Sequence, residues 1–170
     1  MNTKRITYLG ILTALYVVLS FCMKFTVIGN IQIDLGYIAF AVALSIYGVS
    51  GSVVGALGCA IESILLSAYG FSPSWFVANL VIGIGCGLIY KHFENNLIIK
   101  ILATVAVVFL GVGLLKTIIE CQLYSIPFEI KIVKNLVATM IDSVAMIIGL
   151  CLYPQIKRHL GVKNGGSSNE

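Results

Sequence analysis

Charged residues are scarce in this chain. Only 11% of its 170 residues are Asp, Glu, Lys or Arg, whereas a soluble globular domain has about 25%. Hydrophobic residues make up 59% of the sequence, and the mean hydropathy is +1.01. This composition excludes an ordinary soluble domain and predicts an integral membrane protein in the lipid bilayer.

Sequence motifs for catalysis and for nucleotide binding are also lacking. There is no HExxH, no GxSxG and no GxxxxGK[ST] phosphate loop, so the chain does not use ATP by that route. The basic residues lie at the ends of apolar segments rather than in one patch, which argues against a nucleic-acid partner. We therefore expect neither an enzyme nor a nucleic-acid-binding protein.

Cysteines occur without the spacing of a metal site. No CxxC pair is present among the five, and most lie in apolar runs, where cysteine behaves as a small hydrophobe. We expect no metal and no cofactor. Only Cys22 and Cys121 fall where a disulfide is open to consideration.

Long apolar runs dominate the sequence. A helix that crosses a bilayer needs about 20 mostly apolar residues. Six runs approach this length, and the second and third are separated only by a short Gly-rich segment that predicts a tight helical hairpin. The runs are Ile6–Met23, Ile31–Val49, Gly51–Tyr69, Ser74–Tyr90, Ile98–Ile119 and Ile132–Tyr153.

The predicted fold is therefore an all-α membrane protein, a bundle of six transmembrane helices. Residues 1–160 form a single substrate-binding domain, and the polar residues 161–170 form a disordered tail. In an alternative, re-entrant or broken helices replace some spans, because Gly29-Asn30 and Phe71-Ser72-Pro73 are strong helix breakers.

The distribution of Lys and Arg predicts the orientation of the bundle. If both termini lie on one side, that side holds seven basic residues and the other side three. The positive-inside rule then places both termini in the cytoplasm. We expect a multi-pass protein of the cell membrane, in a prokaryotic plasma membrane.

Four ionisable residues lie inside the apolar runs: Asp34, Glu62, Lys116 and Asp142. A charge at the centre of a membrane helix costs about 2.5–3.5 kcal/mol on insertion scales. Asp34 and Lys116 lie near the outer ends, where headgroup contact, snorkelling or pairing of Lys116 with Glu120 accounts for them. Glu62 and Asp142 are too deep and too short to snorkel, so we expect them to face a cavity or a buried partner.

Most polar residues of the spans fall in the outer half of the predicted bundle. Asn135, Thr139 and Asp142 make one stripe on the last helix, because they are spaced by four and three. The inner halves are apolar, which predicts a cup open to the outside rather than a channel. Interhelical hydrogen bonding for the stripe and interfacial anchoring for Trp75 are the alternatives. The candidate substrate-binding residues are Tyr37, Glu62, Trp75, Asn79, Lys116, Asn135, Thr139 and Asp142.

Small residues mark one face of the first span. Gly10 and Ala14 are four residues apart, and small faces let helices approach closely. This face is a candidate for contact with another membrane protein, and packing inside the bundle is the alternative.

Three stretches resemble the substrate-binding S components of energy-coupling factor vitamin transporters. They are IDLGYIAFAVALSIYGVSGSVVGALGCAIESILL, GFSPSWFVANLVIGIGCGLIYK and IPFEIKIVKNLVATMI. The resemblance covers most of residues 4–158. The chain departs from the family pattern at Val49, where a proline is frequent, and at Ala60-Ile61 before Glu62, where a Gly-Asp pair is usual.

The resemblance implies a subunit that binds a water-soluble vitamin from outside. It also implies a transmembrane coupling protein and two cytoplasmic ATPase subunits as partners, with Gly10 and Ala14 as the coupling interface. Segments Lys24–Asn30 and Phe71–Ser74 would gate the site.

A riboflavin- or folate-type vitamin would suit the polar and aromatic residues. Trp75, Tyr37 or Tyr69 would stack on its flat ring. The main alternative is an autonomous proton-coupled secondary transporter of a small metabolite, with Glu62 or Asp142 carrying the proton. A small membrane enzyme and a scaffold without a ligand are the remaining alternatives.

Overall fold

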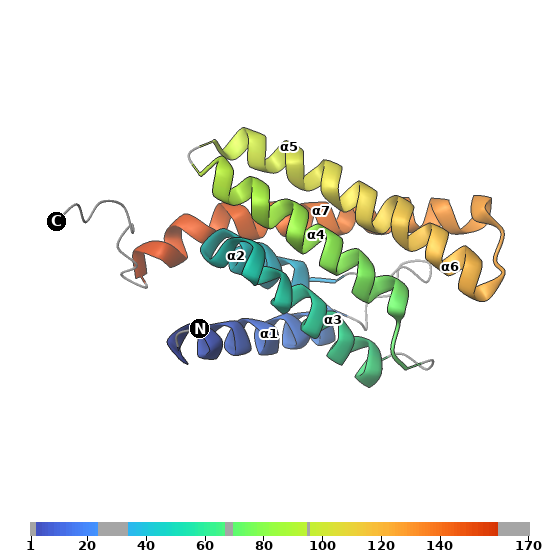
Figure 1. The fold of residues 1–170 in the computed structure, drawn as a ribbon, viewed down its shortest axis with the longest axis horizontal. Coiled ribbons are helices and arrows are strands. Elements are labelled where there is room, and N and C mark those ends of the chain that lie inside the picture. Colours follow the sequence, from blue (N-terminus) through green and yellow to red (C-terminus); the bar gives the residue numbers. More distant parts are fainter. Residues whose placement is uncertain (1–2, 24–33, 67–69, 95, 160–170) are drawn as a thin grey trace.

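The computed structural model describes residues 3–23, 34–66, 70–94 and 96–159, and in these ranges the chain is helical without any strand. The helices run side by side along the long axis of one bundle (Figure 1). Helix α1 begins and helix α7 ends at the same end of that bundle. The elements are α1 (Thr3–Met23), α2 (Gly36–Tyr47), the 3₁₀ turn η1 (Gly48–Gly51), α3 (Ser52–Leu66), α4 (Pro73–His92), α5 (Leu97–Val108), the π-helix η2 (Phe109–Lys116), α6 (Thr117–Tyr124) and α7 (Phe128–His159).

Five helical stretches in the described residues are long and apolar enough to cross a membrane, not the six predicted. The difference lies in the second and third predicted spans, which the structure joins through η1 into one stretch from Gly36 to Leu65. Helix α2 has 12 residues and α3 has 15. At about 1.5 Å per residue each is shorter than the roughly 30 Å hydrocarbon layer. Apolar length alone therefore overestimated the number of full-length spans.

Close backbone contacts fold α2 against α3 as the predicted tight hairpin. A Cβ atom on Gly51 would lie 2.6 Å from the carbonyl oxygen of Ala43, and one on Gly55 would meet the ring of Phe40. Later residues of α3 thus approach earlier residues of α2, so the two helices are antiparallel. Gly48 takes a positive φ of 57° at the reversal, which a residue without Cβ adopts at little cost.

Gly87 lets α4 approach the same turn. A Cβ atom there would lie 2.7 Å from the backbone nitrogen of Val49. We expect Gly87→Ala to destabilise the bundle by about 1–3 kcal/mol, because the added methyl group overpacks against backbone. Gly10→Ala is the matched control, since no atom lies within 4 Å of a Cβ at Gly10. Thermal unfolding in detergent tests this, and an unchanged midpoint for Gly87→Ala would contradict the close approach.

One long apolar helix combines α5, η2 and α6. Residues Phe109–Lys116 form the π-helix η2, and such wide turns are frequent at functional sites. Gly111 allows η2 to pack on α4, where a Cβ would lie 2.6 Å from Ile82. A Cβ on Gly113 would lie 3.4 Å from the Thr139 hydroxyl of α7. The π-helix therefore places Lys116, its last residue, between α4 and α7.

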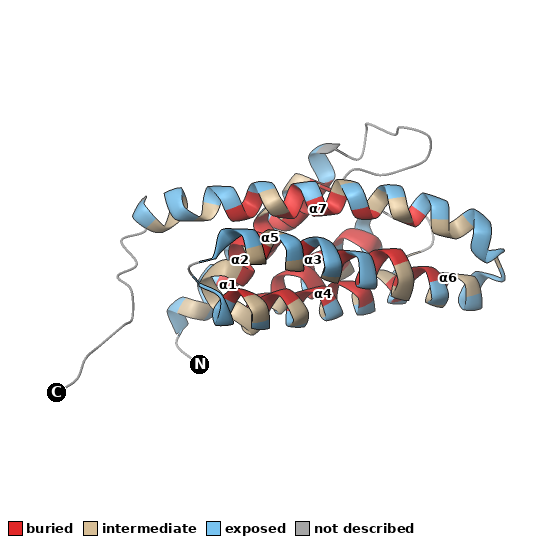
Figure 2. Ribbon diagram, turned by 90° about the horizontal axis from the view of Figure 1, so that it is seen from above, coloured by how far each residue is buried: buried red, intermediate tan, exposed pale blue. Residues whose placement is uncertain are grey.

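The surface of the bundle is hydrophobic as well as its core. Figure 2 shows buried positions on the inward sides of the helices and exposed positions on the outward sides. Large hydrophobic side chains occupy the exposed positions, with Ile98 and Met140 each 70% exposed. Several acidic and amide side chains are buried instead. Together with the five long apolar helices, this pattern identifies a multi-pass membrane protein.

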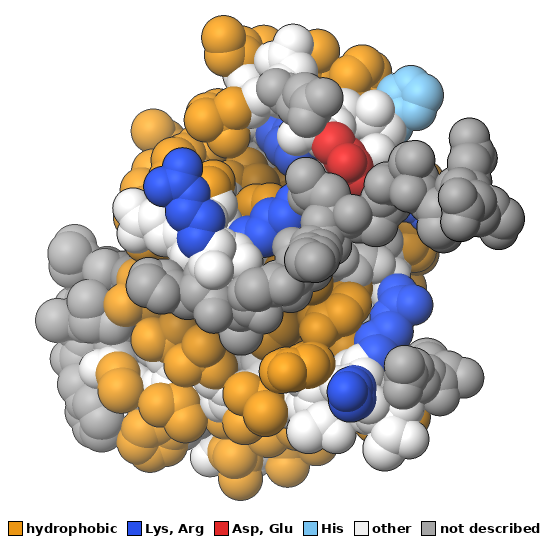
Figure 3. Space-filling view, turned by 90° about the vertical axis from the view of Figure 1, so that its left-hand side faces the viewer, with side chains coloured by type: hydrophobic (Ala, Val, Ile, Leu, Met, Phe, Trp, Pro, Cys, Tyr) orange, Lys and Arg blue, Asp and Glu red, His pale blue; other side chains and the backbone are white. Residues whose placement is uncertain are grey.

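Basic side chains gather at one end of the bundle. Figure 3 shows Lys and Arg among hydrophobic side chains at the end where α1 begins and α7 ends. This is the distribution that the positive-inside rule predicts for a cytoplasmic face, and the cytoplasmic placement of both termini stays a prediction. The basic residues of the helix ends concerned are Lys4, Arg5, Lys91, Lys100, Lys157 and Arg158.

Candidate functional site

The four ionisable side chains of the apolar runs come together inside the bundle. Asp34 is 2% exposed, Glu62 1%, Lys116 9% and Asp142 1%. The charge of Asp142 interacts with those of the other three. The outer interface therefore does not account for Asp34 and Lys116, contrary to our expectation, because both are buried in protein beside the deeper acids.

The acids outnumber the base in this charged group by three to one. Within the described ranges, no three His, Cys, Asp or Glu side chains are grouped so that they could hold a metal ion. Of the three acids, Asp142 has an oxygen without a partner among the described residues, so it is an acceptor available to an uncharged or donor-rich ligand.

Four of the eight predicted binding residues carry a buried polar atom with no hydrogen-bond partner among the described residues. These atoms are Tyr37 Oη, Trp75 Nε1, Asn79 Oδ1 and Asp142 Oδ2. Leaving such an atom unsatisfied costs about 1–3 kcal/mol, and nearly all buried polar groups in proteins have a partner. The four atoms offer an N–H donor, a hydroxyl group and two oxygen acceptors to a bound molecule.

Trp75 and Lys116 are in direct contact. The Lys116 Nζ atom lies 4.3 Å from the centroid of the Trp75 ring, within the range of a cation–π interaction. Lys116 also interacts with the charges of Glu120 and Asp142. Trp75 is half-buried at the start of α4, where Pro73 begins the helix. Its ring therefore has a contact inside the bundle, which interfacial anchoring alone does not explain.

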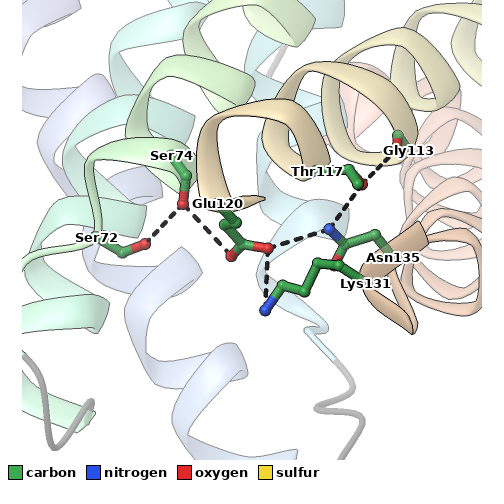
Figure 4. A network of polar contacts seen from close by, with 7 residues as sticks. All are labelled: Ser72, Ser74, Gly113, Thr117, Glu120, Lys131 and Asn135. Atoms are coloured by element: carbon green, nitrogen blue, oxygen red, sulfur yellow. Dashed lines mark hydrogen bonds and ion pairs between the residues drawn. The ribbon is translucent and has the colours of Figure 1, made fainter. Parts of the chain in front are cut away.

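A hydrogen-bond network ties α4, α6 and α7 together next to Lys116 (Figure 4). Glu120 pairs with Lys131 at 3.2 Å and accepts a hydrogen bond of 3.1 Å from Asn135 Nδ2. Asn135 also donates to the Thr117 hydroxyl at 2.9 Å. The Ser74 hydroxyl donates to the other oxygen of Glu120 at 3.4 Å.

The predicted stripe on α7 therefore divides into two parts. The amide of Asn135 faces Glu120 and Thr117, and the Thr139 hydroxyl donates to the Asn135 carbonyl at 2.8 Å. The alternative interpretation of the stripe, hydrogen bonding between helices, therefore holds for Asn135, which bonds two residues of α6. Asp142 instead joins the buried charges and keeps one oxygen without a partner among the described residues.

Sequence reasoning missed two residues of α1, Tyr16 and Ser20. Tyr16 donates a hydrogen bond of 2.8 Å to Asp34 Oδ2, and the Ser20 hydroxyl donates to Asp34 Oδ1. The backbone N–H of Gly36 donates to the same oxygen at 2.8 Å. A signal was present, because Tyr16 and Ser20 are four residues apart and share one helix face, which is buried, whereas Gly10 and Ala14 are exposed.

Gly10 and Ala14 lie on the exposed face of α1. Among the described residues beyond its own turn of helix, a Cβ atom on Gly10 would meet nothing within 4 Å. Packing inside the bundle, the alternative interpretation for these small residues, therefore does not account for Gly10.

Several predicted features lie outside the described residues: the gate segment Lys24–Asn30, Tyr69, and the tail 161–170. The other gate segment begins with Phe71, whose ring centroid lies 5.7 Å from that of Phe76. Cys22 and Cys121 are free thiols in this structure.

Comparison with known protein families agrees with this description. A family model described as "ECF-type riboflavin transporter, S component" matches residues 1–158. No curated protein matches the chain. The matched family is a transporter component rather than a family of enzymes, and the resemblance to S components noted in the sequence is confirmed. The chain therefore belongs to the ECF-type riboflavin transporter S component family.

Proposed function

We propose that this chain is the substrate-specific membrane subunit of an ATP-dependent energy-coupling factor importer, and that it binds riboflavin from outside the cell. The observation that carries the proposal is the set of buried polar atoms on Tyr37, Trp75, Asn79 and Asp142 that have no hydrogen-bond partner among the described residues. A ligand with both donors and acceptors would satisfy them together.

Riboflavin has the chemistry that these atoms require. Its flat ring system suits stacking on Trp75, and the ring edge carries an N–H donor and carbonyl acceptors. The Asn79 oxygen would accept from the ring N–H, and Tyr37 would donate to a ring carbonyl. The Trp75 indole N–H lies in the plane of its own ring, so it would donate to a ribityl hydroxyl rather than to the stacked flavin. The hydroxyl groups of the ribityl chain would donate to Asp142.

The balance of charge favours riboflavin over folate. Asp142 lies near two further acids, Asp34 and Glu62, and near a single base among the described residues, Lys116. A folate brings carboxylates of its own, and like charges in a buried site repel strongly because the local dielectric constant is low. Riboflavin is uncharged and avoids this repulsion.

Energy for transport would come from partner proteins, because the chain has no phosphate loop. The exposed small face of α1 with Gly10 and Ala14 suits contact with a transmembrane coupling protein. Two cytoplasmic ATPase subunits would drive that protein. The subunit itself would not be an enzyme, and it would lie in a prokaryotic plasma membrane with both termini in the cytoplasm.

Proteoliposomes test the proposal against the rival secondary transporter, which the buried carboxylates Glu62 and Asp142 favour. We expect riboflavin uptake only when the chain is reconstituted with the coupling module and ATP. Uptake by the chain alone under a proton gradient would favour the rival. Mass spectrometry of the small molecule that co-purifies with the chain tests the identity of the ligand directly.

Asn79 and Asn135 should respond differently to substitution. We expect Asn79→Ala to weaken riboflavin binding about 5- to 10-fold, the value of one hydrogen bond. Asn135→Ala should instead lower the unfolding free energy by about 1–3 kcal/mol, because Glu120 loses a buried donor. Calorimetric titration and thermal unfolding measure the two effects. If both variants bound riboflavin within about twofold of wild type, the ligand would not lie against Asn79.

A further inference from the structure

Two polar contacts hold α1 to the α2–α3 hairpin. The inner contact is formed by Arg5, whose guanidinium donates to the Tyr47 carbonyl and the Ser50 hydroxyl and lies 5.6 Å from the centroid of the Tyr47 ring. The outer contact is formed by Tyr16 and Ser20, which both donate to the Asp34 carboxylate. The inner contact lies near the start of α1 and the outer contact near its end.

The outer contact is buried and closely packed. Tyr16 and Ser20 are at most 1% exposed. Two glycines allow this close packing, because a side chain at either position would collide with the contact. A Cβ on Gly36 would lie 2.8 Å from Asp34 Oδ1, and one on Gly58 would lie 2.5 Å from the Tyr16 ring. Any displacement of Asp34 must therefore displace its α1 donors as well, because no space is left between them.

The outer contact also adjoins the candidate ligand site. The ring centroid of Tyr16 lies 6.2 Å from that of Tyr37, whose hydroxyl is one of the unpaired groups. The charge of Asp34 acts on both Tyr37 and Asp142. Asp34 further accepts the Gly36 N–H at the start of α2, the residue directly before Tyr37. Asp34 thus touches α1 on one side and the residues that face the ligand on the other.

We propose that Asp34 is a positioning residue that transmits occupancy of the ligand site to α1. This inference rests on the proposed function. A ligand that donates to Asp142 and bonds Tyr37 moves the start of α2, because Tyr37 directly follows Gly36, whose N–H donates to Asp34. Asp34 then carries Tyr16 and Ser20 with it, while Arg5 holds the other end of α1 in place. The exposed side of α1, with Gly10 and Ala14, presents this movement to a partner protein.

Two native thiols allow the movement to be measured in the full chain. Cys22 is exposed on α1 and Cys121 is half-buried on α6, whereas Cys59 and Cys86 are buried. In a Cys151→Ser background, nitroxide labels on Cys22 and Cys121 report the distance from α1 to α6 by pulsed electron paramagnetic resonance. Riboflavin at saturation should shift this distance by about 1–2 Å, the size of a typical helix displacement.

Tyr16→Phe and Asp34→Asn are the test variants. Tyr16→Phe removes the hydroxyl that donates to Asp34, and Asp34→Asn removes the charge of the carboxylate, while both keep the shape of the side chain. We expect both to bind riboflavin and to lose more than half of the distance shift. Ser50→Ala is the matched control, because Arg5 keeps its hydrogen bond to the Tyr47 carbonyl and still anchors the start of α1, and it should retain the full shift.

Three results would overturn the inference: a full shift in both test variants, no shift in a wild-type chain that binds riboflavin, or loss of binding in Asp34→Asn and Tyr16→Phe. The last result would place these residues in ligand binding itself. Flavin fluorescence of the same samples reports binding. Absence of riboflavin binding in the wild type would overturn the proposed function as well, so the two failures are distinguishable.

Discussion

Replacing Asp142 with asparagine is expected to weaken riboflavin binding by about 10- to 100-fold. The Asp142 carboxylate is 1% exposed, and one of its oxygens has no partner among the described residues. A hydrogen bond to a charged group contributes about 1.5–3 kcal/mol, and about 1.4 kcal/mol corresponds to a factor of ten in affinity. Asparagine keeps the shape of the side chain but removes the charge that strengthens this bond.

The same substitution should not destabilise the bundle. Asp142 is buried near Asp34 and Glu62, and an amide costs less to bury among acids than a carboxylate does. We expect an unchanged or higher unfolding temperature together with the lower affinity. Glu129→Gln is the control, because Glu129 is exposed in the first turn of the same helix. An Asp142→Asn variant that binds riboflavin as tightly as Glu129→Gln does would remove Asp142 from the site.

Replacing Lys116 with methionine is expected to destabilise the protein by about 3–5 kcal/mol, the usual cost of removing one partner from a buried ion pair. Lys116 is 9% exposed and is the one base whose charge acts on Asp142 in the described residues. Methionine has a side chain of similar shape but leaves Asp142, which lies near Asp34 and Glu62, without the charge of Lys116. It also removes the cation next to the Trp75 ring.

Lys131→Met is the matched control for this prediction. Lys131 pairs with Glu120 but is 18% exposed, and partly exposed pairs contribute at most about 1 kcal/mol. Denaturant unfolding in mixed micelles compares the two variants. The double variant Lys116→Met with Asp142→Asn should recover part of the loss, because the two sites are coupled. Equal stability of Lys116→Met and wild type would show that Lys116 does not neutralise the acids.

Apolar length predicted the long helices because each one exposes hydrophobic side chains along its whole length. The run Ile98–Ile119 became the helical stretch from Leu97 to Tyr124, and Ser74–Tyr90 became α4. The predicted run Ile31–Val49 matched the bounds of α2 less closely. Asp34 accepts the Gly36 N–H, and this local bond competes with helix formation, so α2 begins only at Gly36. Hydropathy does not record such a bond.

The sequence allowed several candidate site residues to be named, but it did not allow their hydrogen-bond partners to be predicted. Polar residues inside apolar runs indicated Asp142, Trp75 and Asn79, because burial of such groups requires a reason. The same reasoning placed Asn135 among the candidate binding residues, but its amide donates to Glu120. The partner of an amide depends on how α6 packs on α7, which helix periodicity does not specify. The link from Asp34 to Tyr16 joins residues 18 apart in the chain, and its α1 side was missed for the same reason.

Fluorescence of Trp75 tests the central claim most directly. It is the single tryptophan of the chain, so its emission reports on one position without any label. If riboflavin stacks on Trp75 beside Lys116, titration of the purified chain should quench this emission saturably at one riboflavin per chain, with the quenching weakened in Asp142→Asn. Binding of riboflavin without quenching of Trp75, or no binding at all, would contradict the account.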